Sequence, residues 1–301
     1  MNLKESNRPQ VQIKNERNRK IKIGITGATG QLGRLVVNDL KEKTAAENIV
    51  ALVRSPQKAA DLGVTVREFD YNKPENLCSA LQGIDSLLLI SANEIGKRFE
   101  QHTHIIDAAK QAGVKWIVYT SLLKADTTSI VLKDEHLATE AALKSSGIAY
   151  TLLRHGWYTE NYTQAILGAL AQGVMLGCAA HGKISAASRA DFAKAAAVVL
   201  TTAGHQGKIY ELAGDDAFTM SELAAEISHQ TGKTIVYNNV SVAEYTAALI
   251  NMGIPEFFAQ FYASTDSAIT RGDLFENHRL LSKLSGQPTT PMAKTVATIL
   301  A

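Results

Sequence analysis

The chain has 301 residues, 46% of them hydrophobic, which is enough for one large or two modest domains with a substantial core. No stretch is long and apolar enough to span a bilayer, and the N-terminus has no hydrophobic signal segment, so we expect a cytoplasmic protein. The formal net charge is +2, and residues 21–301 hold 25 basic against 27 acidic side chains, which argues against a nucleic-acid-binding face.

The first 20 residues are the basic part of the chain. They contain six Lys or Arg against Glu5 and Glu16, and they have no aromatic residue. A basic arm for nucleic acid or for a membrane surface is one interpretation. The low apolar content favours the other interpretation, a disordered basic tail over 1–20.

A glycine-rich turn follows, between an apolar strand that starts at Ile21 and an amphipathic helical pattern. Gly27 can make the tight turn, Gly30 lets a pyrophosphate approach the backbone, and Gly33 lets the helix lie close to the strand. The unpaired N–H groups and the dipole of the helix start attract negative charge. The turn therefore predicts a dinucleotide site, with Gly27, Thr29, Gly30, Gln31, Leu32 and Gly33 as cofactor-binding residues.

Strand-like runs alternate with helical patterns in the first half of the chain. Several of the strands are continuously apolar, as expected for central strands that are covered on both faces. Repeated strand–helix–strand units with right-handed crossovers predict an α/β fold, a doubly wound parallel sheet of the Rossmann type. The predicted strands start at Ile21 and cover 49–53, 64–69, 86–90, 116–119 and 149–153, and the predicted helices cover 31–43, 74–82, 98–112 and 132–146.

After Leu153 the alternation loosens, and we expect 21–155 to be the dinucleotide-binding domain and 156–301 a smaller α+β lobe, partly interleaved with the sheet. Ser188 and Asp191 form a capping-box pattern at the start of one helix. Cys78 and Cys178 lie far apart with no metal-ligand spacing, which predicts buried free thiols and no metal. The predicted helices cover 158–172, 189–203, 220–231, 242–251 and 255–263, and the predicted strands cover 174–176, 183–185, 208–212 and 234–237.

Ligands of a doubly wound sheet collect at the carboxyl ends of the strands, so the residue after each strand is informative. The second predicted strand is followed by Arg54, where an enzyme that uses NADH would have Asp or Glu. A guanidinium can grip a ribose 2′-phosphate through two hydrogen bonds, which favours NADPH over NADH, and Lys58 is near enough to assist. The alternative is that Arg54 is a solvated loop cation.

Polar residues follow the next strands as well. Asp70 and Tyr71 are predicted to border the adenine, although Asp70 could equally cap the following helix. Ser91, Thr120 and Ser121 stand where the nicotinamide half of the cofactor would lie. Each of these three could instead be a turn former or a helix cap.

Seven motifs in the chain form a recognisable set. They are Gly27-Ala-Thr-Gly30-Gln-Leu-Gly33, Leu52-Val-Arg54, Leu89-Ile-Ser91, Tyr119-Thr-Ser121-Leu-Leu, Asp134-Glu-His136-Leu-Ala-Thr-Glu140, Tyr150-Thr-Leu-Leu-Arg154-His-Gly-Trp157-Tyr158-Thr-Glu-Asn161-Tyr162 and Tyr210-Glu-Leu-Ala-Gly214-Asp. This set resembles the NmrA-like proteins, atypical members of the short-chain dehydrogenase/reductase superfamily, and among them the bacterial NADPH-dependent quinone oxidoreductases. The resemblance covers about residues 21–300. It implies an NADPH-binding Rossmann domain, a small C-terminal lobe, and a cleft in which a quinone could stack on the nicotinamide.

One departure from the wider superfamily bears on mechanism. No Tyr in the chain is followed four residues later by Lys, so the Tyr/Lys acid pair of typical short-chain dehydrogenases is absent. Reduction of an isolated ketone needs a proton for a strongly basic alkoxide, whereas a quinone gives a delocalised hydroquinone anion. Positioning and a few hydrogen-bond donors can suffice for a quinone. The absence of the pair fits a quinone acceptor, and it fits a protein without turnover equally well.

Hydrogen-bond donors for a quinone are predicted after the sixth strand. The catalytic candidates are Tyr158, Asn161 and His155, of which His155 is either a proton source or a polar group that fills the loop. Trp157 offers a flat apolar wall, so Trp157, Tyr158 and Asn161 are the predicted substrate-binding residues. An aromatic group at 257–262 either roofs the substrate pocket or is the apolar side of a helix.

Two functions from different classes remain at this point. The first is an NADPH-dependent oxidoreductase that transfers a hydride to a quinone. The second is a non-catalytic NADP(H)-binding regulator that senses redox state and acts through a protein partner. The expected partner of the enzyme is a quinone or a similar small electrophile, without nucleic acid or membrane insertion, and a homodimer stays open.

Overall fold

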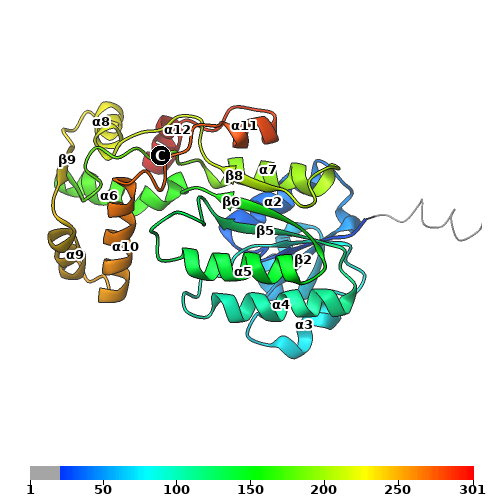
Figure 1. Cartoon of the computed structure of the whole chain (residues 1–301). Coiled ribbons are helices and arrows are strands. Elements are labelled where there is room, and N and C mark those ends of the chain that lie inside the picture. The colour runs from blue at the N-terminus through cyan, green and yellow to red at the C-terminus, as the bar shows by residue number, and fades with distance from the viewer. Residues whose placement is uncertain (1–20) are drawn as a thin grey trace, which may run out of the picture.

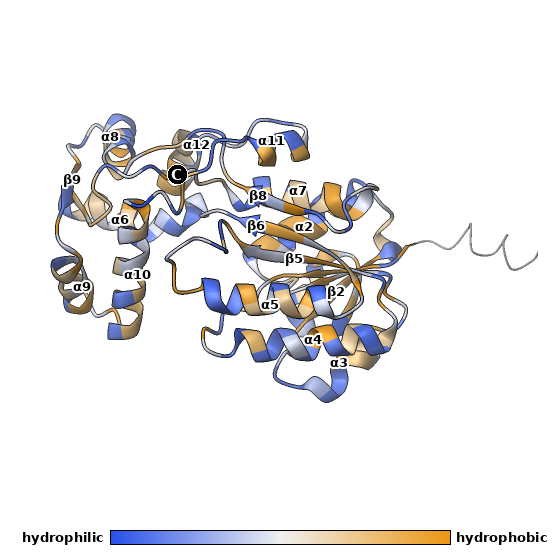
Figure 2. Cartoon of the chain, in the orientation of Figure 1, coloured by the Kyte–Doolittle hydropathy of each residue, from blue (hydrophilic) through white to orange (hydrophobic). Residues whose placement is uncertain are grey.

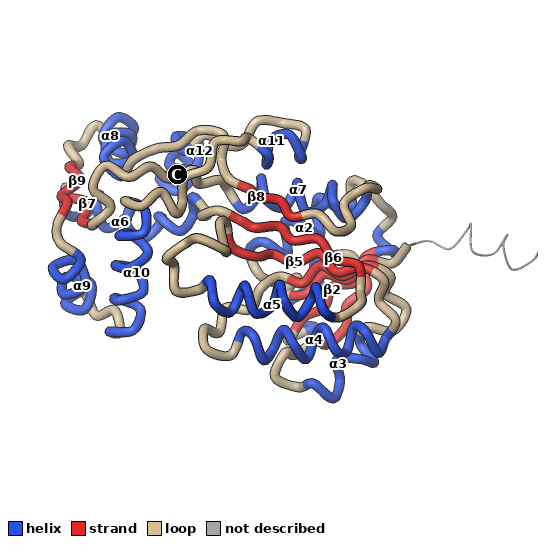
Figure 3. The backbone as a smooth tube through the Cα atoms, viewed as in Figure 1, coloured by secondary structure: helices blue, strands red, loops and turns tan. Residues whose placement is uncertain are grey.

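The computed structural model describes residues 21–301, so the predicted disordered tail at 1–20 lies outside the described residues. The described residues contain a seven-stranded parallel sheet in the order β3-β2-β1-β4-β5-β6-β8, which Figure 3 shows side by side. Because β1 pairs with β2 on one side and with β4 on the other, the loops after β1 and β4 diverge and leave a crevice. The predicted doubly wound, Rossmann-type sheet is confirmed. Its strands are β1 (Ile23–Thr26), β2 (Ile49–Val53), β3 (Thr65–Glu68), β4 (Ser86–Leu89), β5 (Trp116–Leu122), β6 (Ala149–His155) and β8 (Ile209–Leu212).

Both faces of the sheet are buried, and alternate residues of each strand serve the two faces. Ile23 and Ile25 of β1 pack under one helical layer, whereas Leu87 and Leu89 of β4 pack under the other. Burial on both sides explains the continuous apolar runs, and Figure 2 shows apolar residues on the central strands and on α2. The first layer contains α2 (Gln31–Lys41) and α7 (Arg189–Thr201), and the second contains α3 (Pro74–Ala80), α4 (Arg98–Ala112) and α5 (Lys133–Ser145).

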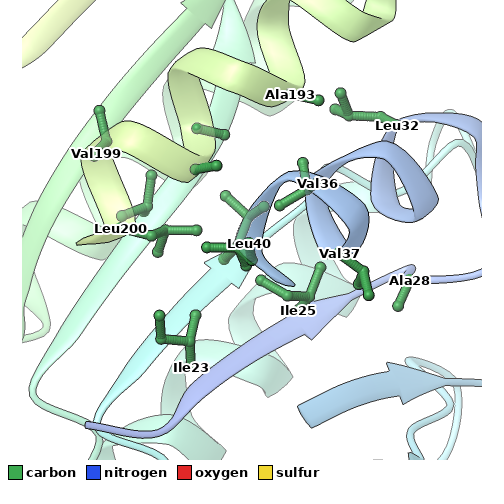
Figure 4. Packing of buried hydrophobic residues seen from close by; sticks show 14 of the residues in the cluster. Ile23, Ile25, Ala28, Leu32, Val36, Val37, Leu40, Ala193, Val199 and Leu200 are labelled. Atoms are coloured by element: carbon green, nitrogen blue, oxygen red, sulfur yellow. The ribbon is translucent and has the colours of Figure 1, made fainter. Parts of the chain in front are cut away.

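Helices α2 and α7 pack together although they are far apart in the sequence. Figure 4 shows Leu32 and Val36 of α2 near Ala193 of α7, and these three side chains are at most 6% exposed. The predicted capping box is confirmed, because Ser188 and Asp191 each accept a backbone N–H of the other at the start of α7. The second half of the chain therefore covers one face of the sheet and also adds β8 beside β6.

A smaller unit with its own core lies beyond the carboxyl ends of the strands, on the left in Figure 1. Its two strands pair in parallel, β7 with β9. Helix α11 (Leu280–Ser285) returns to the main sheet, where Leu281 joins the cluster under α2 and α7. The elements of the smaller unit are η3 (Thr159–Tyr162), α6 (Thr163–Gln172), β7 (Val174–Gly177), α8 (Met220–Thr231), β9 (Val236–Asn239), α9 (Val242–Asn251), α10 (Glu256–Ile269) and α12 (Met292–Leu300), while the short helices η1 (Ala46–Asn48) and η2 (Pro56–Leu62) flank β2.

The predicted elements differ from the structure mainly in the second half. The strand predicted over 183–185 is wrong, because Ile184 makes only an isolated bridge with Phe218 while the Ser185 N–H donates to the Leu274 carbonyl. The helix predicted over 158–172 starts with a 3₁₀ turn, and α10 continues beyond its predicted end at 263. Helices α11 and α12 were not predicted.

Both cysteines are free, as predicted, but only one is buried. Cys178 is inside the smaller unit, whereas Cys78 is partly exposed because α3 turns Leu77 and Ala80 to the core and leaves its flank open. Among residues 21–301, no helix is long and apolar enough to cross a membrane.

Candidate functional site

The glycine-rich turn has the geometry that its spacing predicts. After β1 the chain turns at Gly27 with φ of +58°, a left-handed conformation that favours glycine. The Gly30 N–H closes the turn on the Gly27 carbonyl at 2.9 Å, and Gly30 is the N-cap of α2 with no side-chain capping bond. A Cβ atom on Gly33 would lie 2.3 Å from the Gly27 carbonyl oxygen. The turn and the helix therefore pack as closely as glycine allows, and the first N–H groups of α2 are available to an anion.

A cavity of about 330 Å³, here called the turn cavity, lies beside this turn. It is bounded by loops that follow β1, β2, β3 and β4, the strands on either side of the crevice. Position in the loop after a strand is the signal that could have identified the lining residues that were not predicted, except Gln101, which lies within α4. The predicted residues in the lining are Gly27, Thr29, Gly30, Arg54, Lys58, Asp70, Tyr71 and Ser91, and those not predicted are Ser55, Phe69, Asn72, Ile90, Ala92, Asn93, Glu94 and Gln101.

Two cations at this cavity are available to a ligand. Arg54 and Lys58 are exposed, and neither cationic group has a hydrogen bond or an ion pair with another described residue. Arg34 provides the contrast, because its guanidinium is bonded to the Asp61 carboxylate at 2.6 Å and to a backbone carbonyl. An unpaired guanidinium at the end of β2 is suited to a phosphate group.

Asp70 and Tyr71 shape the cavity from the end of β3. The Tyr71 hydroxyl donates to the Ile90 carbonyl at 3.2 Å, and burial raises its pKa. The Asp70 carboxylate accepts the Asn72 backbone N–H at 3.1 Å, whereas the N-cap residue of α3 is Lys73 and no side chain caps this helix. The alternative in which Asp70 caps the following helix is therefore wrong.

Thr120 and Ser121 lie outside the lining of the turn cavity. Thr120 is 2% exposed, and its hydroxyl oxygen accepts the Ser91 backbone N–H at 2.9 Å. Ser121 donates to the buried Glu140 carboxylate at 2.7 Å, and Arg154 donates to the same carboxylate at 2.6 Å. As consecutive residues of β5, Thr120 and Ser121 face opposite sides of the sheet, so Thr120 supports Ser91 from behind while Ser121 bonds toward α5. Their predicted contact with the nicotinamide half of a cofactor stays a prediction.

Side chains of α4 hold the loop after β4 from behind. The Ala92 N–H donates to His102 Nε2 at 2.9 Å, and Arg98 Nε donates to the Ala92 carbonyl at 2.6 Å. His102 Nδ1 lies 3.0 Å from the Thr139 hydroxyl, which itself donates to the Glu135 carbonyl, so Nδ1 carries the ring proton. Burial and the nearby Arg98 charge lower the pKa of His102 to about 3. A neutral histidine therefore fixes this wall of the turn cavity.

His155 belongs to a buried aromatic group, beside which the partly buried Tyr158 packs. His155 Nδ1 lies 3.1 Å from the Tyr158 hydroxyl, and its ring stacks on Phe192 with centroids 4.4 Å apart. The Arg189 guanidinium lies 4.3 Å from the centre of the Tyr158 ring. Burial lowers the pKa of His155 to about 3, so the imidazole is neutral at pH 7. This favours the interpretation of His155 as a polar group that fills the loop over that of a proton source.

Trp157 and Asn161 line a second cavity of about 320 Å³, here called the aromatic cavity. Asn161 also lines a groove of about 530 Å³ whose lining includes Gln31, the residue directly after Gly30 of the turn cavity. The groove therefore connects the start of α2 with the stretch after β6. Arg189 donates to the Asn161 amide oxygen at 2.9 Å, which leaves the amide N–H group to donate to a ligand.

Five aromatic side chains wall the aromatic cavity, and they come from three separate stretches of the chain: the motif after β6, α9 and α10. Phe261 and Tyr262 of α10 are among them, whereas Phe257 and Phe258 are 57% and 45% exposed. Each of the two alternatives for the aromatic group at 257–262 therefore holds for part of it. Phe261 and Tyr262 line a pocket, whereas Phe257 and Phe258 lie on the helix surface. The five are Trp157, Tyr162, Tyr245, Phe261 and Tyr262.

Comparison with known proteins identifies the class. The NmrA-like family matches residues 19–277, and the chain belongs to this family. Quinone oxidoreductase 2 of Escherichia coli is 52% identical over 278 residues, which cover 91% of this chain and 97% of that protein. Within residues 21–301, no three His, Cys, Asp or Glu side chains are grouped as they would be to hold a metal ion.

Solved structures are similar over the same range. The crystal structure of an Escherichia coli NADPH-dependent quinone oxidoreductase complexed with NADPH has a TM-score of 0.91 and 51% identity, and the match covers 93% of this chain and all of that chain. The Citrobacter triphenylmethane reductase complexed with NADP(H) has a TM-score of 0.89 and 39% identity, covering 92% of this chain and 100% of that chain.

Proposed function

We propose that this protein is an NADPH-dependent oxidoreductase that transfers a hydride to a quinone. One observation carries the proposal: the close-packed glycine turn and the two unpaired cations, Arg54 and Lys58, border the same cavity. The 52% identical relative is named Quinone oxidoreductase 2, and the structure with a TM-score of 0.91 contains NADPH.

The residues of the turn cavity fit NADPH. The absence of side chains at Gly27 and Gly30 and the open N–H groups of α2 suit the diphosphate. Arg54 and Lys58 would hold the 2′-phosphate, which NADH lacks. Asp70 and Tyr71 would border the adenine, and Ser91 would lie toward the nicotinamide, at the end of β4.

The quinone ring would lie in the aromatic cavity, on the side where Asn161 also borders the groove. Trp157 gives a flat wall, and the amide N–H group of Asn161 can donate to a quinone carbonyl. When bound, NADPH supplies the hydride, and one proton from solvent completes the reduction of the quinone to a hydroquinone, leaving NADP⁺. The residues after β6 orient the ring, so no Tyr/Lys acid pair is required.

The same proposal assigns a role to each of the two parts of the chain. Residues 21–155 hold the cofactor and residues 156–301 supply the substrate side, although β8 also completes the sheet and α7 covers one of its faces. The near-neutral charge of residues 21–301 supports a small-molecule partner rather than a nucleic acid.

Steady-state oxidation of NADPH with benzoquinone and naphthoquinone tests the proposal. We expect quinone-dependent loss of NADPH absorbance, with much slower loss when NADH replaces NADPH. If NADPH binds tightly and no quinone is reduced, the enzyme assignment fails and the non-catalytic regulator stands in its place.

A further inference from the structure

A buried hydroxyl without a partner lies at the aromatic cavity. Tyr162 is 8% exposed and lines the cavity, and its phenol oxygen has no hydrogen bond within residues 21–301. A buried polar group of this kind costs free energy unless a ligand satisfies it. Asn161 lines the same cavity with its amide N–H group available. Two hydrogen-bond donors therefore meet in an aromatic-walled space, an arrangement suited to a ring that carries carbonyl oxygens.

An exposed apolar surface continues outward from this cavity. On α10, Phe258 lies three and four residues before Phe261 and Tyr262, so the three form one stripe. Met252, the C-cap residue of α9, lies two turns after the cavity residue Tyr245. Phe258 and Met252 are 45% and 55% exposed. Each stripe thus runs from inside the cavity to solvent near the turn between the two helices.

We name this area the α9–α10 surface and define it by four side chains, each at least 44% exposed. Phe257 and Phe258 pack edge to face with centroids 5.4 Å apart, so their rings form one continuous apolar area. An apolar area of this kind is usually covered by a ligand or a partner. The members are Met252, Phe257, Phe258 and Tyr262.

We propose that the α9–α10 surface binds the apolar tail of a quinone whose ring occupies the aromatic cavity. This rests on the proposed quinone reduction and names its substrate class, a quinone with an alkyl or prenyl tail. Tyr262 carries the argument, because it lines the cavity and is also 44% exposed on the surface. The ligand must therefore extend from the cavity to the surface. A ring with a tail does so, whereas the flat face of a second protein does not enter the cavity.

The test compares one quinone ring with and without a decyl tail, both below the concentration at which the tailed compound forms micelles. For the wild type we expect kcat/KM to be roughly ten-fold higher with the tail, since several methylene groups leave water. In the double variant Met252→Ser/Phe258→Ser, we expect the ratio of the two kcat/KM values to fall toward one. The matched control is Ile209→Ser, which removes a side chain that is 44% exposed on β8, and it should keep the wild-type ratio.

The outcomes separate this inference from the proposed function. If neither quinone is reduced, the proposed function itself fails. If both are reduced with the same kcat/KM, or if the double variant keeps the ratio while it binds NADPH normally, the tail site is wrong. A dimer that sedimentation detects for the wild type and not for the double variant would also overturn it, since a second copy would then cover the surface.

Discussion

The turn cavity and the aromatic cavity are built in different ways. The backbone shapes the turn cavity, because Gly27 turns with a positive φ and Gly33 lets α2 approach the turn more closely than a Cβ atom would permit. Side chains shape the aromatic cavity, and they come from the stretch after β6, from α9 and from α10. A backbone-shaped site should fail abruptly when one atom is added, whereas a site walled by side chains should change by degrees.

The largest effect is expected from Gly33→Ala. The added methyl would lie 2.3 Å from the Gly27 carbonyl oxygen, so the turn must move. We expect the free energy of unfolding to fall by about 2–3 kcal/mol. We expect NADPH affinity to fall by roughly 100-fold, because charge-assisted bonds worth about 1.5–3 kcal/mol each are lost. Urea unfolding and calorimetry measure the two quantities.

Gly168→Ala is the matched control for that substitution. Gly168 lies within α6, and an added Cβ would meet nothing within 4 Å. This variant should gain roughly 0.5–1 kcal/mol of stability and bind NADPH normally. Normal NADPH binding by Gly33→Ala would show that the close packing is not needed.

Low pH should lower the free energy of unfolding, because His102 and His155 are buried behind the turn cavity and in the stretch that ends β6. Burial lowers the folded-state pKa of His102 and of His155 to about 3, against 6.5 in the unfolded chain. Between these values the unfolded state binds more protons, so stability falls as the pH drops below about 6.5 and is constant above it. From about pH 7 to pH 5.5 each histidine should cost roughly 1 kcal/mol of unfolding free energy.

Urea unfolding at several pH values measures this slope. His102→Gln should reduce the slope, whereas His181→Gln, which replaces an exposed histidine, should leave it unchanged. Equal slopes for the wild type and His102→Gln would mean that His102 is not held neutral in the folded protein.

The variant Arg54→Gln tests how much the positive charge of the turn cavity contributes to NADPH binding. Loss of the guanidinium should raise the KM for NADPH roughly 10- to 100-fold, since a hydrogen-bonded charge pair is worth about 1.5–3 kcal/mol. The KM for NADH should change by less than about two-fold, because NADH has no 2′-phosphate for Arg54 to hold. Lys110→Gln removes an exposed cation of α4 and serves as the charge control. An equal loss for both cofactors would place Arg54 elsewhere on the ligand.

The smallest effect is expected from Trp157→Leu in the aromatic cavity. Loss of ring stacking should raise the KM for the quinone roughly two- to ten-fold, in line with about 0.5–1.5 kcal/mol for an aromatic pair. The dissociation constant for NADPH should stay at the wild-type value. A change in NADPH affinity without a change in quinone KM would move Trp157 to the cofactor side.

The turn cavity was predictable because its signals are local. Glycine spacing defines the turn, and Arg54 directly follows an apolar run, so both could be placed from short stretches of sequence. Thr120 and Ser121 were predicted to follow a strand in the same way, yet both lie within β5 and their hydroxyls bond to Ser91 and Glu140. Position after a strand gives the edge of the sheet, but it does not give the direction in which a short polar side chain is engaged.

The aromatic cavity could be predicted only in part, because packing between distant segments creates it. Trp157 and Asn161 were predicted from one motif, whereas Tyr245 joins them only through the fold of α9 against α10. The strand predicted over 183–185 failed for a related reason, since its backbone groups bond to remote loops rather than to a neighbouring strand. Local patterns of apolar residues do not reveal which distant segments a stretch will contact.

Calorimetric titration of the wild-type chain with NADPH and with NADH tests the central claim most directly. We predict that NADPH binds at least roughly ten-fold more tightly, because Arg54 and Lys58 meet a 2′-phosphate that NADH does not carry. Equal binding of the two cofactors, or binding of neither, would contradict the account.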